Sequence, residues 1–279
     1  MTFIGAGSIA EAIIRGLLET GKAAAGQICA INRSDEARLT ALRERYGIET
    51  ASEADAKERM IRRADLLVLA MKPKDVAECL KNIRHLIGER QIVVSVVAGL
   101  SIATIHALLG RSLPVIRAMP NTSCTIGLSA TGICFSDGVD EAARALALEM
   151  FRSVGAAIVV EEKLMDIVTG VSGSGPAYVY YLMEAMIRGG IEGGLSPEAA
   201  RELTVQTVLG AAQMVRATLE EPAELRRKVT SPNGTTQAAL RTLDGYRFGE
   251  AVANAVQRAA ERAREMGAEI SEAADAESA

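Results

Sequence analysis

The feature that most constrains this chain is a glycine-rich turn between a short apolar run and a helical pattern. The turn reads Gly5-Ala6-Gly7-Ser8-Ile9-Ala10. Gly5 allows a tight strand-to-helix turn, Gly7 allows bare backbone to approach a pyrophosphate, and Ala10 allows the helix to lie close to the sheet. The helix start adds free N–H groups and a partial positive charge. The pattern predicts a dinucleotide site with these binding residues: Gly5, Gly7, Ser8, Ile9 and Ala10.

Short apolar runs alternate with helical patterns through the first half of the chain. Runs typical of buried strands occur at 28–31, 66–69, 92–94, 115–116 and 158–160. Near-continuous apolar strands joined by helical crossovers are typical of a parallel sheet that is covered on both faces. We therefore predict an α/β Rossmann domain over residues 1–160, with a doubly wound, mainly parallel sheet.

The second half of the chain has a different pattern. Strand-like runs stop near Glu161, and helical spacing dominates 174–192, 197–219 and 248–266. Ser196 followed by a proline is typical of a helix N-cap and first helical position. We predict an all-α domain over 161–268 and a frayed, acidic tail over 269–279. Small residues are frequent in these helices, which is compatible with a subunit interface or with a monomeric bundle.

Composition and charge exclude several classes of function. The 279 residues carry a net charge of −4 without a basic patch, which disfavours nucleic-acid binding. No apolar run suits a membrane span and no signal-peptide pattern precedes the glycine-rich turn, so we expect a cytoplasmic protein without membrane partners. The four cysteines lack metal-ligand spacing, so we predict free thiols and no metal site. The two histidines lie in segments typical of surface helices and are not expected to be catalytic.

The choice of dinucleotide depends on the end of the second predicted strand, which reads Ile31-Asn32-Arg33-Ser34. An NAD-binding site usually has a carboxylate here that accepts hydrogen bonds from both ribose hydroxyls. The cation of Arg33 and the polar side chains of Asn32 and Ser34 suit a 2′-phosphate instead, which favours NADP(H), with NAD(H) possible. Asp35 comes later, and we expect it to open the next helix. The alternative is that Asn32 and Ser34 are only turn and N-cap residues and that Arg33 is solvated.

Three further loops follow predicted strands at the end of the sheet where such folds bind ligands. They are Ala70-Met71-Lys72-Pro73, the segment from Ser95 to Gly99, and Met119-Pro120-Asn121-Thr122. Taken alone, each loop could be simple chain punctuation. We assign two sets of residues: Ala70, Met71, Lys72, Pro73, Val96, Val97 and Ala98 to the cofactor, and Met119 and Asn121 to the substrate.

Two loops in the helical half are rich in glycine or hydroxyl groups. One runs from Ser172 to Tyr178 and has Pro176 at a helix start, and the other runs from Thr230 to Thr236. Hydroxyl and free N–H groups at a helix start form a ready carboxylate site. Helix capping alone accounts less well for four hydroxyl groups within the second loop.

Taken together, these segments resemble the pyrroline-5-carboxylate reductase family. The matching stretches run in family order across nearly the whole chain: 3–10, 71–73, 117–122, 173–178 and 231–236. The first is common to dinucleotide enzymes, whereas the last two are highly specific. The resemblance implies reduction of Δ1-pyrroline-5-carboxylate to L-proline with NADPH. It also implies a helical domain that intertwines two subunits, and dimers that often form larger rings.

The resemblance also implies roles for residues of the last loop. Thr236 matches the hydroxyl that contacts the ring nitrogen, and we assign it as the catalytic residue. Positions around the substrate carboxylate are matched by the following: Ser231, Gly234, Thr235 and Thr236. The family usually has glycine where this chain has Asn233, but asparagine tolerates a left-handed backbone better than most residues. Two other departures are Ser123 in place of a common proline, and no evident cofactor-contacting asparagine among residues 54–57.

Two alternative functions stay open at this point. One is a β-hydroxyacid-type dehydrogenase, which shares the two-domain plan and normally relies on a catalytic lysine in its helical half. After the first predicted domain this chain has only Lys163 and Lys228. The other is a non-catalytic NADPH-sensing protein on the same fold.

Overall fold

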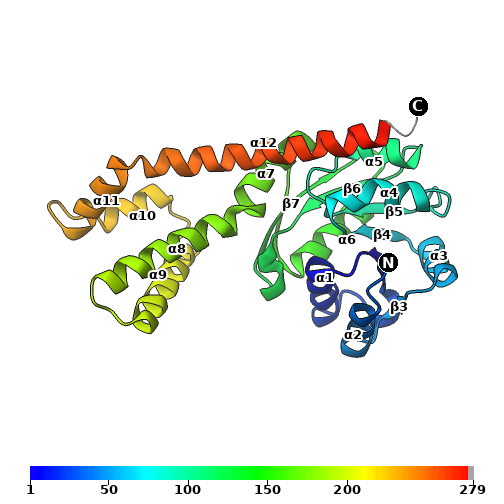
Figure 1. The fold of residues 1–279 in the computed structure, drawn as a ribbon, viewed down its shortest axis with the longest axis horizontal. Coiled ribbons are helices and arrows are strands. Elements are labelled where there is room, and N and C mark those ends of the chain that lie inside the picture. Colours follow the sequence, from blue (N-terminus) through cyan, green and yellow to red (C-terminus); the bar gives the residue numbers. More distant parts are fainter. Residues whose placement is uncertain (276–279) are drawn as a thin grey trace. The chain divides into compact units, whose positions relative to one another are not determined.

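The computed structural model describes residues 1–275 of the chain, which divide into two units (Figure 1). The first unit comprises Met1–Ser174 together with the chain from Gln257 onward, and the second comprises Gly175–Val256. The predicted division at 160 and 268 differs from these units. The chain just after 160 stays with the sheet, since Met165 is fully buried in its core, and the final helix returns to the first unit.

The first unit is built around an eight-stranded sheet in the order β3-β2-β1-β4-β5-β6-β7-β8. The strands are β1 Thr2–Ile4, β2 Cys29–Ile31, β3 Glu49–Ala51, β4 Leu66–Leu69, β5 Ile92–Ser95, β6 Val115–Met119, β7 Ser129–Phe135 and β8 Gly155–Val159. Only β6 and β7 pair antiparallel. The predicted doubly wound, mainly parallel sheet is thus confirmed. Its connections reverse direction beside β1, which is the switch point where such sheets bind ligands.

Successive residues of the central strands enter two different hydrophobic cores. Phe3 and Val68 pack into one core, whereas their neighbours Ile4 and Leu69 pack into the other. This alternation follows from the two-residue period of a strand, and it explains why the runs are apolar throughout. Full burial of one such side chain contributes about 1.5–3 kcal/mol.

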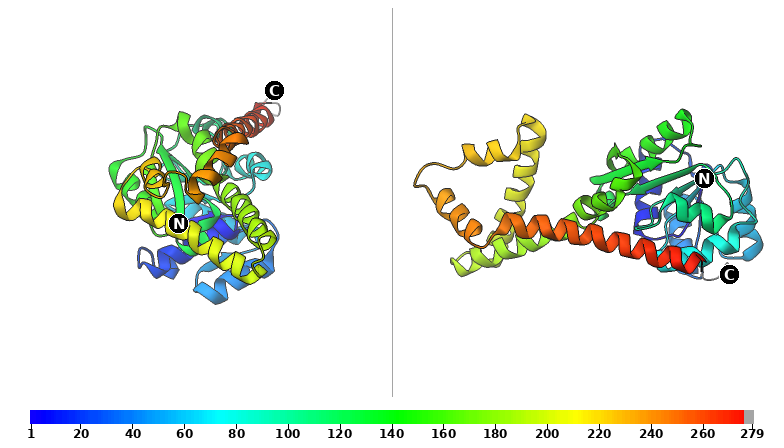
Figure 2. Two further views of the ribbon diagram at one scale, coloured as in Figure 1. Left: turned by 90° about the vertical axis from the view of Figure 1, so that its left-hand side faces the viewer. Right: turned by 90° about the horizontal axis from the view of Figure 1, so that it is seen from above.

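Helices cover both faces of this sheet, as the two views in Figure 2 also show. One core is covered by α1 (Ser8–Glu19), α2 (Glu36–Tyr46) and α6 (Glu141–Arg152). The other is covered by α3 (Ala54–Arg63), α4 (Pro73–Ile83), α5 (Ile102–Leu109) and the end of α12 (Phe248–Asp275). Single-turn helices occupy Ala25–Gln27, Thr122–Ile126 and Glu162–Leu164, and the short helix α7 (Met165–Val168) runs into a π-helical turn at Thr169–Gly173.

Side-chain caps define where several helices begin. Asp35 accepts a hydrogen bond from the N–H of Arg38 at 2.9 Å and so opens α2, which confirms the role expected for Asp35. Ser196 accepts one from the N–H of Ala199 at 3.2 Å, and α9 begins at Pro197. The predicted cap-and-proline start of this helix is therefore confirmed.

The second unit is entirely helical in the described part of the chain. It contains α8 (Gly175–Glu192), α9 (Pro197–Thr218), α10 (Pro222–Lys228), α11 (Thr235–Gly245) and the beginning of α12. Its helices expose many large apolar side chains, including Tyr180, Tyr181, Leu203 and Met214. Exposed apolar surface of this extent is typical of a surface that meets another protein.

The sequence predicts a frayed tail over 269–279, but the first part of this segment is helical in the structure. Helix α12 continues to Asp275, and Ile270 is only 7% exposed in the core of the first unit. Burial of Ile270, the ion pair of Glu269 with Arg262 and the hydrogen bond from Lys81 to the carbonyl of Ala273 hold this end of the helix. Residues 276–279 lie outside the described residues. No helix within residues 1–275 has the length and apolar character needed to cross a membrane.

Candidate functional site

The glycine-rich turn lies at the carboxyl end of β1, between β2 and β4. Gly5 has a φ of +109°, and a Cβ at this position would lie 2.3 Å from the carbonyl oxygen of Ala70. Its N–H donates to the carbonyl of Ile31 at 2.8 Å. Only glycine fits this tightly held, left-handed position, as the motif predicts.

Gly7 is small for a different reason, because the space beside it is open. A Cβ on Gly7 would meet no atom within 4 Å. Gly7 is the N-cap of α1, and no side chain caps that helix end. The first N–H groups of α1 have no acceptor within the helix, so they face this space unpaired. An anionic pyrophosphate fits such a place.

An arginine from α2 holds the turn in position. Arg38 donates from Nε to the carbonyl of Ala6 at 2.7 Å and from Nη2 to the carboxylate of Glu11. Glu11 also accepts from Tyr46 at 2.9 Å and pairs with Arg45 at 3.2 Å. Burial acts to raise the pKa of Glu11, but these hydrogen bonds and cations outweigh it and lower that pKa. Glu11, in the first turn of α1, therefore stays ionised, and neighbouring cations balance its negative charge.

The loop after β2 carries the residues expected at the adenosine ribose. Asn32 closes a turn, because its Nδ2 donates to the carbonyl of Asp35 at 2.7 Å and its Oδ1 accepts from the N–H of Asp35 at 3.1 Å. Ser34 is exposed. The Arg33 side chain is 80% exposed, and its Nη1 lies 3.3 Å from Oδ1 of Asp75. Arg33 and Ser34 are thus accessible to a ligand, whereas Asn32 serves the turn.

Lys57 joins this loop, although the sequence analysis did not identify it. Its Nζ donates to the carbonyl of Arg33 at 3.2 Å, so a second cation lies at the loop after β2. The sequence signal was a lysine in the first half of α3, within the stretch where we sought an asparagine. Only the packing of α3 beside this loop reveals its position.

The two other cofactor loops follow β4 and β5 at the same edge of the sheet. The N–H of Ala70 donates to the carbonyl of Ile4 at 2.9 Å, and the N–H of Val96 donates to that of Leu69 at 3.1 Å. Lys72 is the N-cap of α4, and Pro73 is its first residue. Val97 is only 2% exposed, so its side chain belongs to the core and only its backbone is available to a ligand.

Asn121, which we expect to contact the substrate, has both ends of its side-chain amide bonded within the protein. Its Nδ2 donates to the carbonyl of Ser172 at 3.0 Å, its Oδ1 accepts from the N–H of Ser123 at 3.2 Å, and the residue is 8% exposed. The amide therefore holds two loops together rather than facing open space. Met119 lies nearby at the end of β6, and a Cβ on Gly173 would be 2.8 Å from its Cε. Met119 thus packs directly against the loop that runs from Ser172 to Tyr178.

The hydroxyl-rich loop of the second unit leads into α11. Asn233 has a φ of +58°, which confirms that asparagine keeps the left-handed backbone expected there. A Cβ on Gly234 would lie 2.3 Å from Oγ of Ser231 and 3.1 Å from its carbonyl oxygen, so a side chain here would displace the serine hydroxyl. Gln237, which the sequence analysis did not single out, accepts the N–H of Asn233 on its Oε1 at 3.0 Å. These contacts fix the loop against the start of the helix.

The hydroxyl of Thr236 is left without a partner among the described residues. Other threonines of this unit bond to the carbonyl four residues earlier: Thr230 to Arg226 at 2.6 Å and Thr242 to Ala238 at 3.2 Å. Thr236 is the second residue of α11, so the residue four positions earlier lies outside the helix. The start of α11 thus offers a free hydroxyl and unpaired N–H groups to a ligand.

Lysines and cysteines are poor candidates for catalytic groups here. Lys228 pairs with Glu220, and Lys163 pairs with Glu161 at 2.6 Å. The four cysteines are free. Burial, with the charge of Glu162 as a lesser cause, raises the pKa of Cys134 to about 11, so this thiol stays protonated near neutral pH.

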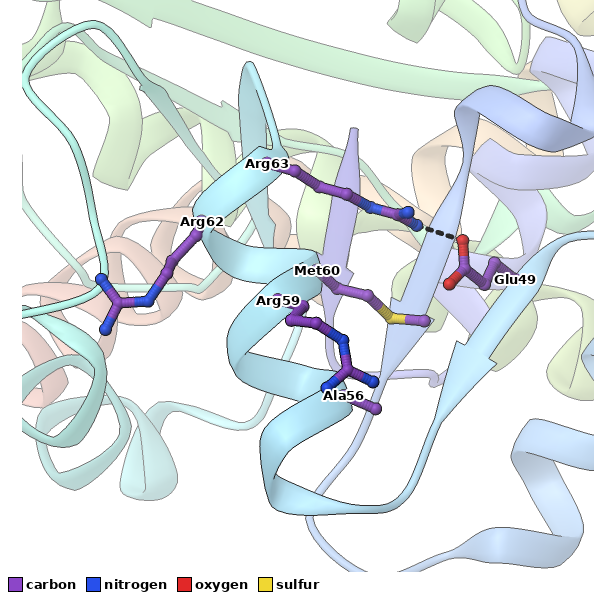
Figure 3. Close-up of a pocket in the computed structure, with 6 residues that line it drawn as sticks. All are labelled: Glu49, Ala56, Arg59, Met60, Arg62 and Arg63. Carbon is purple, nitrogen blue, oxygen red and sulfur yellow. Dashed lines mark hydrogen bonds and ion pairs between the residues drawn. The ribbon is translucent and has the colours of Figure 1, made fainter.

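One surface pocket lies between β3 and α3 (Figure 3). It is lined by Glu49, Ala56, Arg59, Met60, Arg62 and Arg63. Figure 3 shows Arg63 directed at Glu49, with which it forms an ion pair, while Arg62 points the other way. Glu49 is the first residue of β3, so this ion pair lies at the amino end of a strand. Ligands of doubly wound sheets bind at the opposite ends of the strands.

Comparisons with known proteins agree with this arrangement. Residues 162–266 match the family described as pyrroline-5-carboxylate reductase dimerisation, and residues 1–99 match the one described as NADP oxidoreductase coenzyme F420-dependent. Pyrroline-5-carboxylate reductase 1 of Bacillus subtilis is 42% identical over 98% of this chain and 91% of its own length.

Solved structures give the same result. A pyrroline-5-carboxylate reductase from Coxiella burnetii has a TM-score of 0.87 and 35% identity, over 95% of this chain and 97% of its own. Plasmodium falciparum pyrroline carboxylate reductase with NADP bound has a TM-score of 0.85 and 28% identity, over the same shares of the two chains. With a 42% identical relative that spans nearly all of both sequences, this chain belongs to the pyrroline-5-carboxylate reductase family.

Proposed function

We propose that this chain reduces Δ1-pyrroline-5-carboxylate to L-proline with NADPH, the last step of proline biosynthesis. The observation that carries the proposal is the start of α11, where the Thr236 hydroxyl has no partner among the described residues. A carboxylate suits the unpaired N–H groups of this helix start, and a ring nitrogen suits the hydroxyl. The same chain has an open phosphate-binding turn at Gly7, as a dinucleotide-dependent reductase requires.

The chemistry places few demands on acid or base groups of the chain. When bound, NADPH supplies a hydride to the C=N carbon. A cyclic imine takes up a proton from water before the reduction. Its nitrogen keeps this proton when the hydride arrives and becomes the secondary amine of proline. The work of this chain is then orientation and electrostatics. In our proposal, Ser231, Gly234 and Thr235 surround the carboxylate, and Thr236 holds the ring nitrogen.

The cofactor is proposed to lie along the carboxyl ends of β1, β2, β4 and β5. The unpaired N–H groups of Ser8, Ile9 and Ala10 suit its pyrophosphate. Arg33, Ser34 and Lys57 suit the 2′-phosphate of NADPH. The loop from Ala70 to Pro73 and the segment from Val96 to Ala98 would follow the rest of the molecule, with Val97 taking part through its backbone.

The direct test is turnover by the purified full chain with NADPH and Δ1-pyrroline-5-carboxylate. We expect NADPH oxidation and the appearance of L-proline. Turnover of β-hydroxy acids without turnover of the imino acid would favour the dehydrogenase alternative. NADPH binding without turnover of either would favour a sensing protein.

A second prediction concerns the choice between NADPH and NADH. Lys57→Ala removes a cation beside Arg33, and a hydrogen bond to a charged group is worth about 1.5–3 kcal/mol. We expect the KM for NADPH to rise about tenfold while the KM for NADH changes little, because NADH lacks the 2′-phosphate. Lys22→Ala is the matched control, since Lys22 pairs with Glu149 elsewhere. If the ratio of the KM for NADPH to the KM for NADH is unchanged in Lys57→Ala, Lys57 does not belong to the cofactor site.

We also propose that the chain forms a homodimer through the second unit. Its exposed apolar side chains, Tyr181 and Leu203 among them, support this, as does the match of residues 162–266 to a dimerisation family. Assembly of dimers into a ring and a cytoplasmic location stay predictions.

A further inference from the structure

The end of α12 touches the loop that follows β5 through two glycines. Gly99 has a φ of +77°, and a Cβ there would lie 2.9 Å from the carbonyl oxygen of Ala263 and 3.0 Å from the nitrogen of Gly267. A Cβ on Gly267 would in turn lie 2.5 Å from the carbonyl oxygen of Gly99. Loop backbone and helix backbone are therefore in direct contact, with no room for a side chain on either residue.

Other contacts hold this part of α12 in the first unit. Ala260, Ala263 and Ile270 are 0%, 3% and 7% exposed. Nζ of Lys81 on α4 donates to the carbonyl of Ala273 at 3.2 Å, and the end of α12 lies beside α4 in Figure 1. Nε of Arg264 lies 3.8 Å from Oδ2 of Asp166. The helix end is thus a fixed support and not a loose terminus.

The supported loop has shorter hydrogen bonds of its own in its first half than in its second, where the N–H of Leu100 donates to the carbonyl of Val97 at 3.4 Å and closes a turn through Gly99. The N–H of Val96 donates to Leu69 at 3.1 Å, and the N–H of Val97 donates to Oγ of Ser95 at 3.2 Å. At Gly99 the contact is with α12. A displacement of the helix would therefore be transmitted to the second half of the loop.

We propose that Gly267 is a positioning residue for the cofactor: by letting α12 lie against Gly99, it sets the place of the Val96–Gly99 loop. The inference rests on the proposed function only in that this loop lines the NADPH site. Its chemistry is steric. No side chain of α12 needs to touch the cofactor, since the helix acts through the loop backbone.

The test compares two glycine-to-alanine changes within one helix. In Gly267→Ala, the new Cβ must move roughly 1 Å away from Gly99 to reach an ordinary contact distance, and a misplacement of that size can cost up to about 10² in rate or affinity. In Gly249→Ala, in the first turn of the same helix, the new Cβ meets nothing within 4 Å.

We expect Gly267→Ala to raise the Kd for NADPH about tenfold, and Gly249→Ala to leave it unchanged within about twofold. Binding is measured by fluorescence titration without substrate, so the result does not depend on turnover. Where turnover is present, the KM for the imino acid should stay within about twofold, because the substrate loop belongs to another helix. A Gly267→Ala variant that is folded by circular dichroism and binds NADPH like the wild type would overturn the proposal.

The wild-type protein provides a second test that needs no variant. Coupling between two sites is reciprocal, so a cofactor held by the loop should also stabilise the helix end that supports it. We expect NADPH to slow amide hydrogen exchange in residues 263–273 as well as in residues 96–100. Unchanged exchange at the end of α12, with slower exchange at the glycine-rich turn, would contradict the proposed support.

Discussion

Thr236→Ala is expected to lower kcat by about 10²–10³, whereas the Kd for NADPH should stay within about twofold of the wild type. The reason is that the lost hydroxyl would orient the ring nitrogen, whose bonding changes as the hydride arrives. The hydroxyl has no structural partner among the described residues, so its loss should not unfold the helix. Stopped-flow measurement of NADPH oxidation and fluorescence titration of NADPH separate the two effects.

The chain offers a close control for this change within the same helix. The hydroxyl of Thr242 donates to the carbonyl of Ala238 at 3.2 Å, so Thr242→Ala removes an exposed hydroxyl from α11 without removing a ligand contact. We expect it to turn over normally, and we expect Thr236→Ser to recover much of the lost activity. Near-wild-type kcat in Thr236→Ala would exclude this threonine from the mechanism.

The parts of the fold that the sequence predicted are those encoded by local patterns. Apolar runs predicted most strands of the sheet because both of its faces are buried. Strand β7 escaped prediction because its polar residues break the run, among them Ser129 and Thr131, which bond to each other inside the protein at 3.0 Å. The helical end of the chain was also missed, because burial of Ile270 depends on distant partners that no local pattern contains.

The residues of the candidate site also divide into those that a local pattern predicts and those that it does not. The glycine-rich turn and the left-handed backbone of Asn233 follow from short motifs, and the structure has both. Lys57, Arg38 and the pair formed by Gly99 and Gly267 act across long sequence separations, so no local pattern reveals what they contact. Asn121 shows the opposite case. It lies within a recognised motif, yet its side chain forms hydrogen bonds with backbone groups of the protein.

Arg117→Ala is expected to lower the free energy of unfolding by about 3–5 kcal/mol. Arg117 belongs to one of the family stretches, yet its side chain is only 7% exposed and lies away from solvent. Its Nη2 donates to Oδ1 of Asp166 at 3.2 Å, and its Nη1 lies 3.5 Å from Oε1 of Glu162. Glu162 also accepts the N–H of Ile102 at 2.7 Å. This cation therefore links β6 to both α7 and the start of α5.

Removal of the arginine takes the cation from between two partly buried carboxylates, of which Asp166 keeps the exposed Arg264 at 3.8 Å, and it opens a cavity beside β6. Both effects act in the same direction. Arg62→Ala is the control, because Arg62 is exposed and lies 3.8 Å from Glu58, an arrangement worth only about 0.3–0.5 kcal/mol. Denaturant unfolding at one fixed protomer concentration measures both variants, since association also contributes to stability. A loss below about 1 kcal/mol for Arg117→Ala would mean that these groups find equivalent partners in water, and that the buried arginine does not hold the sheet to α7.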